Sequence, residues 1–401
     1  MDRIIKIVFT ALLLGLFLGA VAQQAYAGPV IRMPNNVGWL QINYEMQLYG
    51  QWRDNGSGSD GTKSTTDIYF RRNRLSFRGM MNEKYGFYYA QEFQGDRYIG
   101  ALNTWETPVS DFFVLDAFFS ANYSDAFNLR AGLTKDPLVR EHNVGCFFPL
   151  SMDRSLFVYT SIPRVSRDFG VLLWGNLMNQ KMQYKVSAME GIDGTDTPSS
   201  NLRYTGRVHY SFWDPESLPL YFSNYFGAKK VLTIGGGYQF ELDAAYGNQA
   251  LQTLEKDYSA WTVDLFTEYP TASAGTFTFG AAYLDSNFDD AYLGGDPSSP
   301  SIGIDGQKNG YYFKGGYMLP NKVGPGQLQF FARYENWSFA NLGGIEDQEI
   351  DWSAAGVNYF LKGQDLRLTF EYSFNDFERE DPNDPNTEDF STATVMLQFR
   401  F

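Results

Sequence analysis

Apolar and polar residues alternate along the last twelve residues of the chain, from Phe390 to Phe401. One parity is wholly apolar and consists of Ala393, Val395, Leu397, Phe399 and Phe401. The other parity is mostly polar, with Met396 as the exception among Thr392, Thr394, Gln398 and Arg400. Because successive side chains of a strand point to opposite faces, this segment is predicted to be a β-strand with one apolar face.

The same alternation recurs along the chain, most clearly between Leu40 and Leu48, where apolar residues occupy the even positions. It predicts strands near 40–48, 67–81, 85–94, 109–123, 127–135, 164–176, 181–190, 201–213, 230–243, 257–269, 275–285, 308–319, 326–337, 350–361, 365–375 and 390–401. An even number of strands, about sixteen of roughly ten residues each, is typical of a bacterial transmembrane barrel. The expected fold is therefore an all-β, antiparallel transmembrane barrel.

The connections between these strands also alternate in length. Short ones, expected on the periplasmic side, are 177–180, 271–274, 321–325 and 362–364. Long polar ones, expected outside the cell, are 191–200, 286–307, 338–349 and 376–389. Residues 214–229 are an exception, because they fall on the short-turn side yet are long, and a periplasmic plug or interface element is one interpretation.

The N-terminus predicts export. Arg3 and Lys6 precede an apolar run from Ile7 to Val21, and Ala25-Tyr26-Ala27 resembles a cleavage site. We expect residues 1–27 to be a cleaved signal peptide and 28–401 to be the barrel domain; a membrane anchor is the alternative. The barrel would then lie in the lipid of the outer membrane of a Gram-negative cell.

Composition supports this class and excludes others. Aromatic residues make up 17% of a chain whose mean hydropathy is −0.33, as expected for aromatic girdles on alternating strands. The net charge of −14 lies largely in loop-like stretches and predicts no nucleic-acid partner. One cysteine, two histidines and the absence of a C-x-x-C-H motif predict no disulfide, metal or covalent haem. No nucleophile or metalloprotease motif is present, so no catalytic residue and no enzyme are expected.

An arginine run gives the first candidate for pore chemistry. Arg72, Arg74 and Arg78 share the parity opposite to Leu75, Phe77 and Gly79. Facing lipid would cost about 2–4 kcal/mol for each arginine, so we expect all three to face the lumen, where such a ladder favours anions. The alternative is that they pair with lumen acids and stiffen the wall.

Residues 136–163 are far longer than a hairpin needs and more apolar than the other long connections. We expect this loop to fold into the lumen and narrow it; an external cap or a subunit contact is the alternative. The candidate constriction residues are Arg140, His142, Phe147, Phe148 and Arg154.

Further basic residues are predicted to line the lumen beside the arginine run. They are Arg130, Lys135, Arg167, Lys185, Arg203 and Arg207. The acids on lumen parity come later in the chain and are Glu241, Asp264, Glu268, Glu335 and Glu371. A transverse field, basic on the early strands and acidic opposite, is therefore expected.

Several segments resemble the phosphate-selective porin O/P family. They are the strand Arg71-Arg72-x-Arg74-Leu75-x-x-x-Gly79, Tyr88-Tyr89-Ala90-Gln91-Glu92-Phe93, Asp116-Ala117-Phe118, Leu129-Arg130-Ala131-Gly132-Leu133-Thr134-Lys135-x-Pro137 and Pro163-Arg164-x-x-Arg167-Asp168-x-Gly170. The resemblance covers roughly residues 69–191, and the later half agrees only in pattern.

The resemblance implies a sixteen-stranded, trimeric outer-membrane porin with a basic lumen that a loop constricts. The expected function is passive diffusion of small hydrophilic solutes, particularly inorganic or organic anions such as phosphate. The alternative is the sheath of a porin–cytochrome conduit, in which a multihaem cytochrome would thread the barrel.

Overall fold

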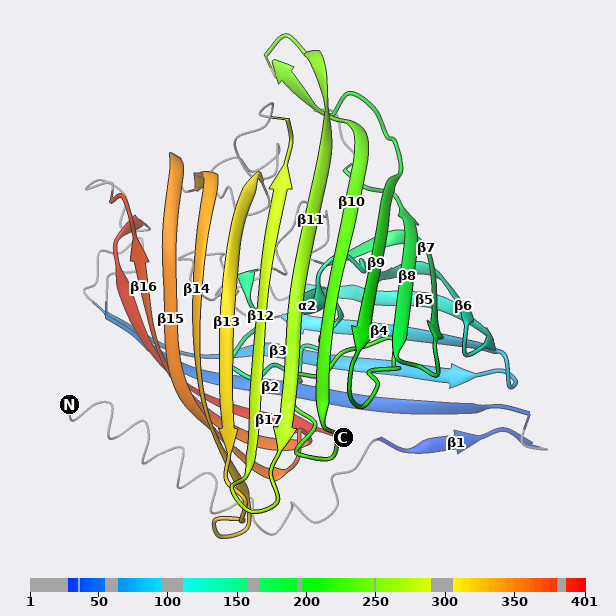
Figure 1. The fold of residues 1–401 in the computed structure, drawn as a ribbon, viewed down its shortest axis with the longest axis vertical. Helices are drawn as coiled ribbons and strands as arrows, with labels where there is room; N and C mark the ends of the chain where they lie inside the picture. Colours follow the sequence, from blue (N-terminus) through cyan, green and yellow to red (C-terminus); the bar gives the residue numbers. More distant parts are fainter. Residues whose placement is uncertain are drawn as a thin grey trace.

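The computed structural model describes residues 28–34, 37–54, 64–94, 111–156, 166–192, 197–248, 250–289, 306–342, 344–380 and 387–401 (Figure 1). The expected signal peptide, residues 1–27, and the end of the expected constriction loop, residues 157–163, lie outside these ranges. Within them no helix is long and apolar enough to cross a membrane.

The described chain forms one antiparallel sheet that closes on itself. Its first strands are β1 (Val30–Arg32), β2 (Trp39–Arg53), β3 (Thr65–Met80), β4 (Tyr85–Gln94), β5 (Asp111–Ser124), β6 (Phe127–Lys135), β7 (Arg167–Leu177), β8 (Met182–Met189) and β9 (Arg203–Ser211). The later strands are β10 (Val231–Asn248), β11 (Thr253–Pro270), β12 (Thr276–Asn287), β13 (Lys308–Met318), β14 (Gln327–Leu342), β15 (Ile345–Lys362), β16 (Leu366–Phe377) and β17 (Phe390–Arg400).

Closure comes from the pairing of β17 with β2, whose register runs from Thr392↔Arg53 to Arg400↔Glu45. Each remaining strand from β2 to β17 pairs with its neighbours in sequence, including β9 with β10. The predicted sixteen-stranded antiparallel barrel is therefore confirmed, since β2 to β17 form the ring. A closed ring leaves no strand edge exposed to lipid.

The short strand β1 was not predicted. It pairs with β2 from Val30↔Gln41 to Arg32↔Trp39, just beyond the point where β17 ends. There β2 would otherwise present free backbone groups, and β1 satisfies them.

Strand ends differ from the prediction at the end of the barrel that carries the long connections. The prediction of a long loop over 338–349 is wrong, because β14 and β15 remain paired as far as Asn341↔Glu346 and Leu342↔Ile345. Polar residues occupy much of this stretch, so it lacks the alternation on which the prediction rested. Backbone pairing does not need an apolar face and continues without one.

The barrel is polar inside and apolar outside. In β9 the side chains of Arg203, Arg207 and His209 are buried, while Tyr204 and Tyr210 between them are exposed. Exposed large apolar side chains occur around the ring from β3 to β16, as expected for a wall that faces lipid.

The exception in the final strand has a structural reason. Met396 lies on the inner face with the polar residues of β17 and is fully buried. It packs against Tyr49, Tyr69 and Met152, so an apolar side chain is required at this inner position.

Candidate functional site

Residues 136–156, which follow β6 and include the one-turn helix α2 (Arg140–Asn143), lie inside the ring of strands (Figure 1). Near their start, the Asp136 carboxylate accepts hydrogen bonds from Gln239 of β10 at 2.8 Å and Thr205 of β9 at 3.1 Å. Further on, the Met152 amide donates to Glu371 of β16 at 2.8 Å. Contacts of this segment with opposite walls mean that it crosses the lumen.

One end of this segment is held by two consecutive arginines. Asp153 Oδ1 lies 2.7 Å from Arg72 Nη2, and its Oδ2 lies 2.6 Å from Arg71 Nη2. A β-bulge opposite Gln47 and Leu48 turns both arginines inward, which regular alternation forbids. Burial opposes ionisation of Asp153, but the two guanidiniums hold the pKa of its carboxyl far below its usual range.

A second segment, residues 214–229, enters the lumen from the end of the barrel that carries the short turns. Glu216 accepts hydrogen bonds from Arg140 Nη1 at 2.9 Å and Nη2 at 2.6 Å, and from the Tyr225 hydroxyl at 2.7 Å. Burial raises the pKa of Glu216, but Arg140 outweighs it and lowers that pKa to about 2.

The two segments also meet through their backbones. The Tyr221 amide donates to Asn143 O at 3.0 Å, within a short parallel bridge between Val144 and Tyr221. Lys185 of β8 donates to both segments, at 3.1 Å to Asn143 Oδ1 and at 3.0 Å to Pro219 O. Residues 136–156 and 214–229 therefore form one obstruction, which we call the two-part plug.

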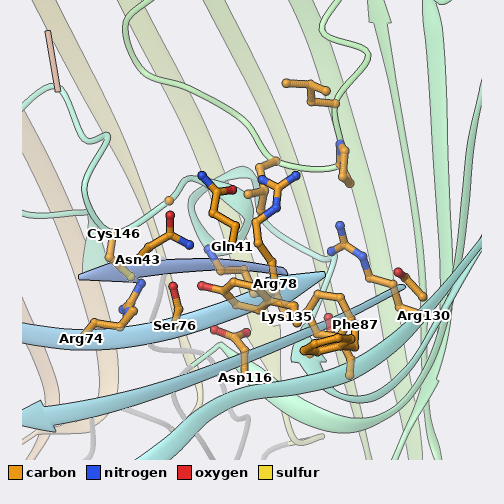
Figure 2. Close-up of a pocket in the computed structure, with 18 of the residues that line it drawn as sticks. Gln41, Asn43, Arg74, Ser76, Arg78, Phe87, Asp116, Arg130, Lys135 and Cys146 are labelled. Atoms are coloured by element: carbon orange, nitrogen blue, oxygen red, sulfur yellow. The ribbon is translucent and has the colours of Figure 1, made fainter. Parts of the chain in front are cut away.

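The lumen is filled unevenly. On the side of β10 to β17 an apolar cluster packs against Leu138, Val139 and Leu156 of the plug. On the side of β2 to β7 a cavity of about 600 Å³ remains between the strands and the plug (Figure 2). Its charged lining residues are Glu45, Arg74, Arg78, Asp116, Arg130, Lys135, Arg167 and Arg400.

Most of the basic residues predicted for the lumen are inside the barrel but neutralised by a nearby carboxylate. Arg203 lies 2.7 Å from Glu241, and Arg207 lies 2.6 Å from Asp264. The remaining pairs are Arg72 with Asp153, Arg74 with Glu92 and with Glu45, and Arg167 with Asp116. For these five arginines the alternative interpretation, pairing with lumen acids, describes the geometry.

Two arginines of the cavity differ from the others. Within the described residues, neither Arg78 nor Arg130 has a carboxylate at ion-pair distance. Figure 2 shows both side chains extending from their strands into the same cavity. Lys135 and Lys185 are also without a carboxylate partner in this part of the chain, but each donates to a neutral oxygen of the plug.

The acids expected opposite the basic wall are buried on the inner face but serve local contacts. Glu335 accepts from Ser155 at 2.6 Å, and Glu268 accepts from the amides of Tyr225 and Gly227, each at 2.7 Å. Because Glu241 and Asp264 are paired with arginines, the expected transverse field is largely cancelled close to its source.

The predicted loop residues all belong to the plug. Arg140 joins its two parts, His142 is fully buried 3.5 Å from Asp136, and Arg154 donates to Glu141 O at 3.4 Å. Phe147 and Phe148 line the cavity, and Phe148 packs against Phe222 with ring centroids 4.8 Å apart.

Other inner basic residues were missed. Lys314, Arg333 and Arg367 each contact the plug, and each alternates with apolar neighbours, so the parity rule could have found them. Arg71 lies on the parity opposite to Ile68 and Phe70, and the bulge lets both it and Arg72 face inward.

The thiol of Cys146 lines the cavity beside several arginines. Burial raises the pKa of its thiol, but the guanidiniums of Arg154, Arg74 and Arg167 outweigh burial and hold that pKa well below its usual range. The plug side of the cavity is therefore electropositive.

Comparisons with known proteins agree with the barrel fold. No curated protein matches the chain. An anion-selective porin from Comamonas acidovorans is similar in fold, with TM-score 0.59, 12% identity, and 91% of this chain and 100% of that chain covered. OmpF of Salmonella typhi, in a complex with daunomycin, gives TM-score 0.61 and 13% identity over 92% and 100% of the two chains. OmpT of Vibrio cholerae in its trimer form gives TM-score 0.53 and 11% identity, with 91% of this chain and 100% of that chain covered.

The family match, and not the fold alone, defines the protein as an outer-membrane channel. The profile of phosphate-selective porin O and P matches residues 45–401, and the chain belongs to this family.

Proposed function

We propose that this porin lets small hydrophilic solutes diffuse across the outer membrane and prefers anions, such as phosphate. The observation that carries the proposal is the pair Arg78 and Arg130. Their charges face a cavity and have no carboxylate at ion-pair distance in the described chain.

The expected preference can be estimated. A unit charge roughly 7 Å from a permeating anion contributes about 0.6–2.4 kcal/mol at effective dielectric constants between 80 and 20. Each arginine then favours anion entry by about 3-fold to about 50-fold. Each paired arginine contributes less, because the neighbouring carboxylate cancels part of its field.

In this proposal the two-part plug is the constriction. The path is narrowed by its predicted members Arg140, His142, Phe147, Phe148 and Arg154. Arg78 and Arg130 set the preference of this path for anions. Arg72, Arg74, Arg167, Arg203 and Arg207 hold the plug and the wall, while Lys135 and Lys185 anchor the plug.

The occupied lumen argues against the cytochrome sheath. A space of about 600 Å³ is the size of a small-molecule site and does not admit a folded haem protein.

We further propose that residues 1–27 are removed during export and that the barrel, 28–401, assembles as a homotrimer. The Ala25-Tyr26-Ala27 sequence supports cleavage. The trimer form of the similarly folded OmpT supports the assembly.

Anion-limited swelling of vesicles tests the function. Proteoliposomes in isosmotic potassium chloride with valinomycin swell at a rate set by anion entry, because valinomycin carries the potassium. We expect Arg78→Gln and Arg130→Gln each to slow swelling at least about threefold. Lys84→Gln, on an exposed turn away from the cavity, is the matched control and should not slow it. Wild-type vesicles that fail to swell, or arginine variants that match the control, would contradict the proposal.

A further inference from the structure

The cavity wall is aromatic as well as basic. Its lining includes the rings of Trp39, Tyr88, Phe118, Phe148, Trp174 and Phe222, contributed by strands of the wall and by both parts of the plug. A volume of about 600 Å³ lies within the range of sites that enclose a small organic molecule. Hydrated inorganic ions need no such surface, so the aromatic lining calls for its own explanation.

The rings and the two free arginines are organised together. The Arg130 guanidinium lies 4.8 Å from the ring centroid of Phe118, which in turn lies 5.6 Å from Tyr88. The Arg78 guanidinium lies 5.2 Å from the ring of Trp39. Stacking on a ring orients a guanidinium plane while leaving its edge N–H groups available to a ligand.

Strand β7, which pairs with the Arg130 strand β6, adds a second kind of surface to the cavity. Trp174 of β7 lines the cavity without a cation near its ring among the described residues, and Phe222 comes from the plug. These two apolar faces can take the flat body of a ligand whose charged end lies at the arginines.

We propose that this cavity binds small aromatic carboxylates, of which benzoate is the simplest. The inference rests on the proposed function and names a preferred substrate class for the same site. The carboxylate would accept paired hydrogen bonds from the fork of Arg130, with the charge of Arg78 in the same cavity. The ring would lie against the aromatic wall, where a phosphate or acetate ion makes no comparable contact. An uncharged aromatic amide would keep the ring contact and lose the charge-assisted bonds.

Calorimetric titration of the detergent-solubilised protein tests the proposal with three probes. Benzoate carries ring and charge, acetate carries the charge alone, and benzamide carries the ring alone. We expect benzoate to bind at least about tenfold more tightly than acetate or benzamide, because each lacks one class of contact. Equal affinities for benzoate and acetate, or for benzoate and benzamide, would overturn the proposal.

Variants separate the two contributions. Arg130→Gln should weaken benzoate binding about tenfold or more and leave benzamide unchanged. Trp174→Leu should weaken benzoate and benzamide alike and leave acetate unchanged. Arg130→Lys keeps the charge without the planar fork and should fall between wild type and Arg130→Gln. Lys84→Gln is the control and should bind all three as wild type does.

Bilayer recordings on the same preparations distinguish failure of this inference from failure of the proposed function. Anion-selective steps with no benzoate preference overturn the aromatic site alone. Absence of steps, or cation preference, overturns the proposed function beneath it. The recordings and the circular dichroism of each variant report folding independently, so a misfolded variant is recognised. If Arg130→Gln misfolds, the benzoate affinities of Trp174→Leu and Arg130→Lys test the proposal instead.

Discussion

The ion pair between Arg140 and Glu216 should hold the two parts of the plug together. Glu216→Gln keeps the shape of the side chain but leaves Arg140 charged and buried without its carboxylate. Removing one partner of a buried ion pair costs about 3–5 kcal/mol. The lower value applies here, because Arg140 retains its contacts with the rings of Tyr221 at 4.5 Å and Phe266 at 4.3 Å. A loss of 3 kcal/mol raises the population of the separated state about 100-fold or more.

Hydrogen exchange at the Tyr221 amide measures this separation, because that amide donates to Asn143 across the junction. We expect Glu216→Gln to speed its exchange about 100-fold or more. The control is Lys256→Gln, which breaks the exposed ion pair between Lys256 and Asp289 at 2.9 Å. A surface pair contributes under about 1 kcal/mol and does not touch the plug, so exchange at Tyr221 should not change. Equal exchange rates in wild type and Glu216→Gln would refute the view that this pair locks the plug.

Three further predictions follow from the charges around the plug. Asp153→Ala should remove the carboxylate that Arg71 and Arg72 share, destabilise the plug by about 3–5 kcal/mol and shift the reversal potential toward chloride; an unchanged potential would contradict this. Cys146 should react at least about tenfold faster with an anionic methanethiosulfonate than with a cationic one of similar size, and mass spectrometry measures the ratio; a ratio at or below one would contradict the electropositive cavity. The lowered pKa values of Glu216, about 2, and of Asp153 mean that their ion pairs stabilise the plug fully above the unfolded carboxylate pKa of about 4 and lose this contribution as pH falls toward the folded value. Infrared difference spectra should therefore show Glu216 protonating below about pH 3, and its protonation near pH 5 would contradict the assignment.

The wall of the barrel could be predicted because the face that each strand residue takes depends only on its immediate neighbours in sequence. Lipid outside and water inside impose a period of two, so Phe390 to Phe401 already show which face each residue takes. The same rule gave the boundaries of β4 and β6 and the inward direction of Arg203 and Arg207. It lost accuracy above the membrane, where β14 and β15 pair without an apolar face.

The lumen could be predicted only in part, because its contacts join residues far apart in sequence. The loop composition indicated entry into the lumen, but nothing local to 214–229 shows that Glu216 meets Arg140, which lies 76 residues earlier. Likewise, parity placed Arg72, Arg74 and Arg78 on one face without telling paired arginines from free ones. That distinction depends on Asp153 and Glu92, whose positions are set by the plug and by β4.

The bulge in β3 shows a further limit. A single extra residue reverses the alternation, so Arg71 faces inward beside Arg72. The apolar residues are Ile68 and Phe70, at even positions, before the bulge and Leu75 and Phe77, at odd positions, after it. This change of parity marks the bulge in the sequence, although the prediction of one regular strand over 67–81 overlooks it.

The central claim is that unpaired arginines beside the plug make this porin prefer anions. The reversal potential of single wild-type channels, measured in a planar bilayer across a tenfold gradient of potassium chloride, tests it most directly. The account predicts resolved single-channel steps and a potential with the sign of chloride permeation. A potential with the sign of potassium permeation, or a bilayer without steps, would contradict it.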